Sequence, residues 1–576
     1  MVGLPEDRRS AARSWSGFGR ATSEAIALPE SLIESSGPET GLRAPQFSRP
    51  AEALLALAIT ALLLIPCVWQ QRIQAGDLSS HVYNAWLAQE IKKNMVQGLA
   101  LVPVWTNVLT DWALERLMSA GGERVAERVV TGSAALVFFW GAFFAISVAS
   151  RRRPWLLSPI LGMLTYGLVF HYGFLNFYLS TGLCLWVLGL LWHPTKRRVL
   201  LALPLTVLAV LAHGLPVLWV FSVLAYLHLT WRIPEVWRIL LPVGGFAALI
   251  LIQTVLMSRF TYNWSVSQTA SLDGYAGIMG VGQVWLFDSK YLIVSGALLL
   301  VFVILFLERF DRGNFLNDPL TQIWILHMAA FVLMPSAVRL PQYQHVLAYI
   351  PERISLLIAI SFCLMVGKAN YGRGITRLSG VAAAAFFLFL YVDYGAFNQV
   401  EDQVTALVAE LPPGQRVVAA ITDSGSHLNA LTHVADRACI GRCFSYADYE
   451  PATGQFRIRI AGPNRVIAPS MPVVQEIEYG QHVVTPAEAP LYSVCPCEKE
   501  GKQFCLRALS AGEKTCAFSS TVSLRLWDWV PQRFPIMGGL ARERQRKIPD
   551  HQSRVPVINQ VDQMAAAAPH TKGAQQ

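Results

Sequence analysis

The sequence predicts an α-helical polytopic membrane protein of about eleven transmembrane helices, followed by a mixed α/β domain outside the membrane. Three observations predict this fold class. Of the 576 residues, 53% are hydrophobic and only 15% are charged, whereas soluble domains contain about 25% charged residues. Apolar runs near the length that crosses a hydrocarbon core recur along most of the chain. After residue 392, short apolar stretches alternate with polar turns.

The apolar runs define the predicted transmembrane domain, residues 51–395. Eleven runs are candidates for membrane spans: residues 51–71, 130–150, 155–170, 174–192, 199–212, 215–229, 240–257, 291–307, 320–334, 354–366 and 378–392. A helix needs roughly 17–25 residues to cross a bilayer. Several runs are shorter than this, so the number of spans could differ by one or two.

Basic residues predict the orientation. Lys and Arg in short loops remain on the cytoplasmic side of a membrane. Alternate loops of this chain carry them, at 151–154, 195–198, 231–238, 308–312 and 367–377, and six arginines precede the first span. The N-terminus is therefore expected in the cytoplasm and the region after residue 392 outside. This topology also explains the net charge of +9 without invoking nucleic acid.

Two tails and one folded domain flank or follow the spans. Residues 1–50, rich in Ser, Gly, Pro and Arg, predict a disordered cytoplasmic tail. In the extracytoplasmic domain, residues 396–535, we expect a helix at 400–411 and then strands at "QRVVAAITD", "NRVIAP", "HVVTP" and "SLRLWDW". Residues 536–576 are polar or low in complexity and predict a second disordered tail.

Cysteine positions agree with this topology. Cys67, Cys184 and Cys363 fall within spans, where cysteine serves as a small apolar residue. The other six cysteines, at 439, 443, 495, 497, 505 and 516, all fall in the region assigned outside. An even number on an oxidising side predicts up to three disulfides. Zinc binding by "CIGRC" and "CPC" is the alternative interpretation, although neither has a regular C-x-x-C spacing.

The long first external loop, residues 72–129, is where we look first for chemistry. It opens with "GDLSSH" and continues as a pattern that predicts a helix lying on the membrane surface, followed by a second such helix within 107–130. A helix that begins at Asp77 places Asp77 and His81 on one face, at the mouth of the first span. The structural alternative is that Asp77 caps the helix, as aspartate often does.

This arrangement resembles the C-type glycosyltransferase superfamily (GT-C). The resemblance covers most of the chain: an acidic residue soon after the first span, two helices in a long first external loop, about eleven spans and an external C-terminal domain. "GDLSSH" is similar to the Asp-x-x-x-His pattern of less characterised bacterial members, and it lacks the paired "DD" or "DE" of the best-known families. The resemblance implies a polyprenyl-phosphate-linked sugar donor, and a catalytic role for Asp77 and His81 as base or metal ligand.

Transfer from such a donor needs cations that neutralise the leaving phosphate. Arg339, Arg353 and His345 lie in an external loop, against the inward bias of arginine in this chain, and are the candidate phosphate ligands. Arg353 could equally pair with Glu352 or extend to the interface, and His345 could be an ordinary loop residue.

Two tight external turns add histidines on the same side. "FHYGFLN" and "AHGLP" present His171 and His213 on the face that carries Asp77. Histidine and carboxylate groups suit several divalent ions, so Asp77, His171 and His213 are candidate ligands of a divalent metal cofactor.

The predicted function is therefore transfer of a sugar from a lipid-linked donor to an acceptor on the outer face of a bacterial inner membrane, with the C-terminal domain in the periplasm. Two alternatives remain open. One is a transporter or flippase of lipid-linked glycan, although the sequence contains no convincing internal repeat of the kind that transporters often have. The other is an inactive GT-C-like scaffold of the cell envelope. The sequence identifies neither the sugar nor the acceptor.

Overall fold

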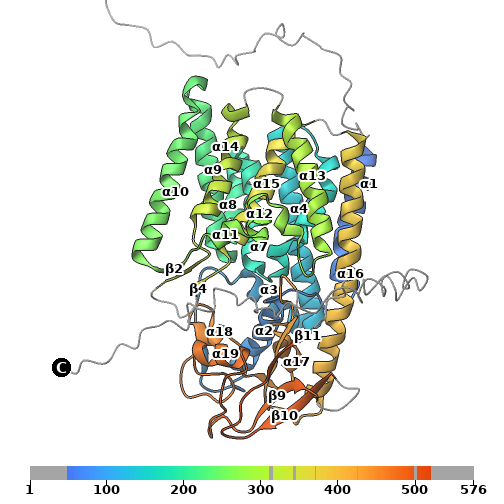
Figure 1. The fold of residues 1–576 in the computed structure, drawn as a ribbon, viewed down its shortest axis with the longest axis vertical. Coiled ribbons are helices and arrows are strands. Elements are labelled where there is room, and N and C mark those ends of the chain that lie inside the picture. The colour runs from blue at the N-terminus through green and yellow to red at the C-terminus, as the bar shows by residue number, and fades with distance from the viewer. Residues whose placement is uncertain are drawn as a thin grey trace, which may run out of the picture. The chain divides into compact units, whose positions relative to one another are not determined.

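The structure is a computed structural model that describes residues 49–310, 315–340, 346–369, 372–423, 426–497 and 503–520. Residues 1–48 of the N-terminal tail predicted at 1–50, the tail predicted at 536–576, the strand expected at 523–529 and His345 lie outside the described residues. Residues 49 and 50 already belong to the first helix. The helical part and the strand-bearing part belong to one compact unit (Figure 1).

Each of the eleven apolar runs contains helix. The helices are α1 (Arg49–Leu64), α4 (Glu123–Ser150), α5 (Ser158–Thr165) with α6 (Leu168–His171), α7 (Leu175–Leu191), α8 (Lys196–Ala212), α9 (Gly214–Arg232), α10 (Leu240–Arg259), α13 (Tyr291–Phe310), α14 (Pro319–Leu333), α15 (Ile350–Val366) and α16 (Arg373–Ala409). Among the described residues, six helical segments are long and apolar enough to cross a membrane, and they include α1, α4, α9, α10, α13 and α16. The count of eleven spans remains a prediction.

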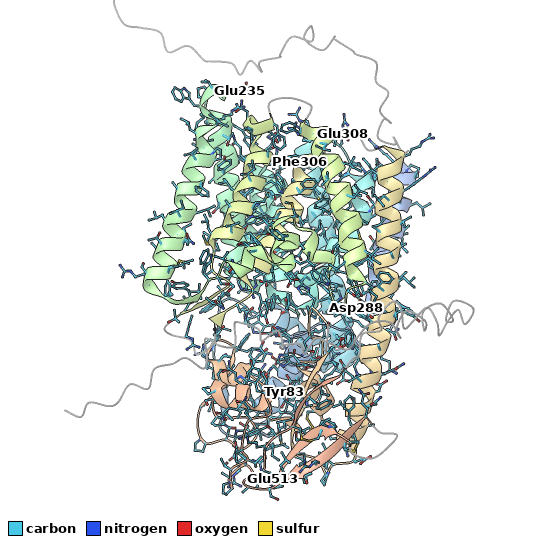
Figure 2. The ribbon with its side chains drawn as sticks, viewed as in Figure 1. Tyr83, Glu235, Asp288, Phe306, Glu308 and Glu513 are labelled. Atoms are coloured by element: carbon cyan, nitrogen blue, oxygen red, sulfur yellow. A yellow bond between two sulfur atoms is a disulfide. The ribbon has the colours of Figure 1, made fainter. Side chains whose placement is uncertain are left out.

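The loops rich in Arg and Lys gather at one end of the helices. Arg153, after α4, forms an ion pair with Glu52 at the start of α1, and the carbonyl of Arg238 accepts a hydrogen bond from Gln322 in α14. Figure 2 shows Glu235 and Glu308 near this end and Asp288 at the opposite one. The alternation read from the sequence therefore places the basic loops together in space.

Small residues allow the central helices to pack closely. A Cβ atom added to Gly141 of α4 would lie 2.6 Å from the carbonyl oxygen of Gly182 in α7. Close approach of backbones through small residues is how helices associate within membranes, where lipid is as apolar as the side chains. Substitution at either glycine would separate α4 from α7.

The first external loop forms two helices, α2 (Leu78–Lys92) and α3 (Leu109–Gly121), but the prediction that α2 lies on the membrane surface is wrong. Ten of its fifteen residues are buried. Helix α2 packs against α3 on one side and against α17 (Val434–Cys439) on the other, between the helical part and the C-terminal elements (Figure 1). Its apolar residues are covered by protein, because distant parts of the chain fold over it.

The C-terminal domain, residues 410–520, is mixed α/β. Its described helices include α18 (Glu450–Thr453) and α19 (Met471–Glu478). One four-stranded sheet has the order β10 (Phe504–Leu509), β9 (Leu491–Pro496), β5 (Arg416–Val418), β7 (Phe444–Ser445), with β5 parallel to both neighbours. A separate parallel pair joins β6 (Ala420–Asp423) to β11 (Ala517–Ser520). The strands expected at "NRVIAP" and "HVVTP" are wrong: the first is irregular and the second makes only an isolated bridge at Val483.

Two features join this domain to the rest of the chain. Helix α16 runs without interruption past the predicted boundary at residue 396 and ends only at Ala409. Strand β1 (Leu99–Leu101) of the first loop pairs with β8 (Ile458–Ile460) of the domain in an antiparallel ladder. The first loop and the C-terminal domain therefore form a continuous structure.

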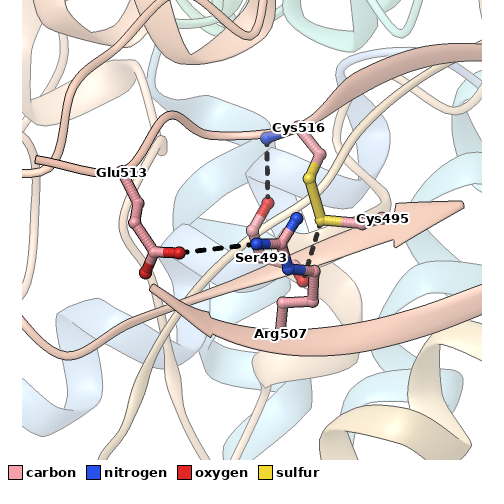
Figure 3. Close-up of a disulfide and its surroundings, with 5 residues drawn as sticks. All are labelled: Ser493, Cys495, Arg507, Glu513 and Cys516. Atoms are coloured by element: carbon pink, nitrogen blue, oxygen red, sulfur yellow. Dashed lines mark hydrogen bonds and ion pairs between the residues drawn. A yellow bond between two sulfur atoms is a disulfide. The ribbon is translucent and has the colours of Figure 1, made fainter. Parts of the chain in front are cut away.

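The prediction of three disulfides among the six cysteines of the C-terminal domain is confirmed. These cysteines are paired as Cys439–Cys443, Cys495–Cys516 and Cys497–Cys505, and Cys67, Cys184 and Cys363 are free and buried. Figure 3 shows the Cys495–Cys516 bridge beside Ser493, whose hydroxyl accepts a hydrogen bond from the backbone N–H of Cys516. The thiols that zinc would require are therefore consumed.

A small sheet lies in the external loops between the later helices. Strands β2 (Thr261–Asn263), β3 (Ala337–Arg339) and β4 (Val346–Leu347) are antiparallel neighbours. The chain then enters α15 through Tyr349, whose φ of 57° is left-handed. Such a backbone is strained for a residue other than glycine, and strain of this kind concentrates at functional sites.

Candidate functional site

The backbone around Asp77 is held by the turn between α6 and α7. The N–H of Gly76 donates to the carbonyl of His171 at 2.8 Å, and the N–H of Asp77 donates to the carbonyl of Tyr172 at 3.0 Å. Gly173 has a φ of +82°, and a Cβ there would lie 2.5 Å from the Asp77 nitrogen. Only glycine fits this contact, so the turn fixes where Asp77 sits.

The Asp77 side chain does not cap α2, although the residue occupies the N-cap position. Its carboxylate instead faces His433, with 3.5 Å between Oδ1 and the histidine Nε2. The other ring nitrogen of His433, Nδ1, lies 3.3 Å from Oδ2 of Asp436. The chain Asp77–His433–Asp436 thus connects the first loop to α17, and 29% of the Asp77 side chain remains exposed.

The charge of His433 follows from these contacts. Burial lowers the pKa of His433, but the carboxylates of Asp436 and Asp77 outweigh it and raise the pKa well above its usual value. An imidazole with a carboxylate on each nitrogen is an imidazolium that donates on both sides. His433 therefore orients the Asp77 carboxylate, while the exposed part of Asp77 is left for another group.

His81 forms the second half of the site. Its Nδ1 lies 3.1 Å from Oε1 of Glu450 and 3.3 Å from Oδ1 of Asp111. Burial lowers the pKa of His81, and the two carboxylates raise it well above the usual value. Burial raises the pKa of Glu450, which the contact with His81 only partly offsets. His81 thus binds α2 to α3 and α18 and makes no contact with substrate-accessible space, since it is 5% exposed.

Asp448 lies between the two histidines. Its Oδ1 accepts hydrogen bonds from Asn84 at 3.1 Å and Ser80 at 3.3 Å. Burial and the nearby charges of Asp436 and Glu450 raise its pKa well above the usual value. We call the set His81, His433, Asp77, Asp111, Asp436, Asp448 and Glu450 the histidine–carboxylate cluster.

Arg353 provides a cation within electrostatic reach of Asp77. Its guanidinium lies 4.4 Å from the ring centre of Phe174 and 5.3 Å from that of Phe177, and the charge of Glu352 and, less strongly, that of Asp77 act on it. Its Nε and Nη1 atoms are buried and have no hydrogen-bond partner. Buried N–H groups normally have partners. Two guanidinium nitrogens of Arg353 are therefore free to bind the anion that the sequence analysis predicted.

An aromatic wall adjoins this guanidinium. Tyr172 and Phe174 stack with ring centres 5.1 Å apart, and Tyr349 packs against both, at 4.6 and 5.5 Å. All three side chains are partly exposed. The wall combines the turn that holds Asp77 with the strained entry to α15.

The other predicted residues are placed less centrally. Arg339 ends β3, paired with Val346 and Thr261, and its Nε is buried without a hydrogen bond. His171 donates from Nδ1 to the carbonyl of Gly167 and accepts from the hydroxyl of Tyr394 at 2.9 Å. His213 caps α9 by accepting from the N–H of Leu215. His345 lies outside the described residues.

The proposed metal ligands do not converge. Both ring nitrogens of His171 and the Nδ1 of His213 are engaged within the protein. Within the described ranges, no group of three or more histidine, cysteine, aspartate or glutamate side chains is arranged to hold a metal ion. Asp77, His171 and His213 therefore do not form a metal-binding site.

Sequence reasoning missed the partners contributed by the C-terminal domain. His433, Asp436, Asp448 and Glu450 lie some 350 residues after Asp77. Their local signal is one histidine and three acidic residues within "HVADRACIGRCFSYADYE", beside two cysteines that the sequence analysis assigned to the outside of the membrane.

Comparison with protein-family models, with curated proteins and with solved structures found no match. The chemistry must be argued from the geometry alone. An oriented, partly exposed carboxylate can accept a proton, and a guanidinium without a partner can bind an anion.

Proposed function

We propose that the protein is a membrane glycosyltransferase that moves a sugar from a polyprenyl-phosphate-linked donor to an acceptor on the outer face of the membrane. The observation that carries the proposal is the pairing of Asp77, oriented by His433, with the free guanidinium of Arg353. Such a transfer requires a base and an anion-binding cation near each other.

The reaction follows from these roles. The acceptor hydroxyl attacks the anomeric carbon of the donor sugar, and the bond between that carbon and the phosphate oxygen breaks. Asp77 takes the hydroxyl proton, and the polyprenyl phosphate leaves as an anion beside Arg353. Oriented bases contribute about 10²–10⁴-fold to such a step, and a preorganised cation stabilises the charge that develops on the leaving group.

The aromatic wall gives the sugar a surface. Tyr172, Phe174 and Tyr349 present faces and edges next to both charged groups. Aromatic side chains combine apolar faces with polar atoms, which suits a sugar ring with one apolar face. The helical surface of exposed Leu, Val and Ile residues suits the lipid tail of the donor.

Transport of a lipid-linked glycan is the second candidate, and one observation favours it. Lys290 is buried and lies 2.8 Å from both Asp288 and Asp393, the latter in α16. Ionisable residues inside membranes often mark a pathway. All three side chains are paired within the group, however, so it also has a structural explanation, as a link between the segment that enters α13 and α16.

The experiment compares Asp77→Asn with Asp402→Asn in purified membranes supplied with a panel of polyprenyl-phosphate sugars. Asp402 is an external aspartate that also forms one ion pair, with Arg72 at 2.6 Å, and it is half exposed. We expect Asp77→Asn to lower the transfer rate about 10²–10⁴-fold and Asp402→Asn to leave it unchanged. Equal activity of the two variants would refute the role of Asp77. Movement of the lipid-linked sugar across the membrane without transfer would favour the transporter.

A further inference from the structure

A cavity lies at the opposite end of the helices from the histidine–carboxylate cluster. It has a volume of about 680 Å³ and lies between the start of α1, the C-terminal half of α4, Trp155 and α7. Its apolar wall is aromatic and includes Trp140, Phe143, Phe144 and Trp186. Pockets of this size commonly hold small ligands, and the exposure of Ala53 and Arg49 leaves this one open at the side of the helices.

Charged side chains border the aromatic wall. Arg49 and Arg153 are exposed cations, and Glu52 lies 2.5 Å from Arg153. The sum of these charges is one positive charge. The border therefore complements an anion, and the wall below it complements an apolar chain.

One polar group in the cavity lacks a partner. The indole N–H of Trp155 is buried without a hydrogen bond, and the side chain is only 9% exposed. The two other tryptophans of the wall are satisfied: Trp140 donates to Thr60 and Trp186 to the carbonyl of Val137. A buried N–H without a partner is unfavourable, so the contrast points to an acceptor that the cavity receives from outside the protein.

We propose that this cavity binds an anionic phospholipid of the leaflet next to the basic loops. The phosphate lies near Arg49 and Arg153, an ester carbonyl accepts the Trp155 N–H, and the upper acyl chain packs on the aromatic wall. Tryptophan and arginine are the residues that membrane proteins place at this depth, and basic residues here attract anionic lipid by about 1 kcal/mol each. In the predicted topology this is the cytoplasmic leaflet, which carries anionic lipid. The site is independent of the proposed transferase activity.

Three substitutions separate lipid binding from a structural role. Arg153→Gln removes a phosphate ligand, and we expect about fivefold weaker binding. Glu52→Gln removes the negative charge that occupies Arg153, and we expect severalfold tighter binding. Trp155→Phe removes the N–H that no protein group uses together with part of the buried indole, so it should weaken lipid binding by more than the lost packing on Phe143 and Trp140 lowers thermal stability.

The measurement is native mass spectrometry of the full-length protein, delipidated in detergent and titrated with phosphatidylglycerol or with zwitterionic phosphatidylcholine. Arg197→Gln is the matched control, because Arg197 is an exposed cation at the same end of the helices but does not line the cavity. We expect the wild type to retain phosphatidylglycerol in preference to phosphatidylcholine. Phosphatidylglycerol should bind most tightly to Glu52→Gln, equally to the wild type and Arg197→Gln, and most weakly to Arg153→Gln. Equal binding of the two lipids, or weaker binding by Glu52→Gln, would overturn the proposal.

Discussion

Replacing Arg437 with glutamine should destabilise the attachment of the C-terminal domain by about 3–5 kcal/mol, the usual effect of removing one partner from a buried ion pair. Arg437 lies in α17 and is 8% exposed. Its Nη1 contacts both carboxylate oxygens of Glu401 in α16 at 3.1 Å. Its Nη2 donates to the carbonyl of Ile73 at 3.2 Å and lies 3.5 Å from Glu127 of α4.

The magnitude follows from what the substitution leaves behind. Glu401 and Glu127 are 3% and 4% exposed, so without Arg437 both are buried beside each other. Glu127 then retains only a neutral hydrogen bond, from the N–H of Ile73, whereas Glu401 retains a hydrogen bond from Gln74 and an ion pair with Arg72 at 3.4 Å. The cost is the burial of uncompensated charge, and additional substitutions Glu127→Gln and Glu401→Gln should restore much of the lost stability.

Pulse proteolysis of the detergent-solubilised protein over a urea series measures the free energy of opening the domain. Arg507→Gln is the control, since Arg507 pairs with Glu513 at 3.5 Å but the two side chains are 57% and 42% exposed (Figure 3). Exposed pairs contribute about 0.2–1 kcal/mol. A loss of less than 1 kcal/mol in Arg437→Gln, similar to that in Arg507→Gln, would refute the reasoning.

Three further outcomes are expected. The raised pKa values of the buried imidazoles in the histidine–carboxylate cluster stabilise the fold fully below about pH 6.5, and this contribution is lost as the pH rises through those raised values. Domain stability measured by proteolysis should therefore fall from pH 6 to pH 9. Stability that rises over this range would contradict the assignment. Cys495→Ser should lower domain stability by about 2–5 kcal/mol relative to the wild type. Thermal unfolding of both proteins checks this, and the difference between them should vanish in reductant. Gly173→Ala should lower transfer activity at least tenfold by displacing Asp77, whereas Gly414→Ala, at a φ of +81° with nothing nearby, should not.

The helical part could be predicted because each helix has a local cause. Apolar runs, basic loops and turn residues at 151–154, 195–198 and 231–238 are all readable within a short window of sequence. The position of Asp77 at the start of a helix was also readable. Burial was not: α2 has the composition of a surface helix, and the packing of α3 and α17 against it makes it interior.

The candidate site was half predictable for the same reason. Asp77 and Arg353 carry signals of their own: a carboxylate soon after a predicted span, and an arginine in a loop predicted to be external, against the inward bias of arginine in this chain. The contact between Asp77 and His433 joins residues far apart in the chain, and no property of either residue specifies the other. Metal binding by His171 and His213 failed as a prediction because hydrogen bonds to Tyr394 and Leu215 occupy their rings.

Helix α16 has a mechanical consequence. Its 37 residues extend about 55 Å at 1.5 Å per residue, against a hydrocarbon core of about 30 Å. The remaining 25 Å or so would project from a bilayer as a stiff rod that carries Glu401 and ends shortly before β5. A helix responds to a thinner bilayer by tilting. A tilt of about 10° would sweep the far end of the rod by about 4 Å. Because Glu401 pairs with Arg437 of α17, a thinner bilayer would strain the contact that joins α16 to α17.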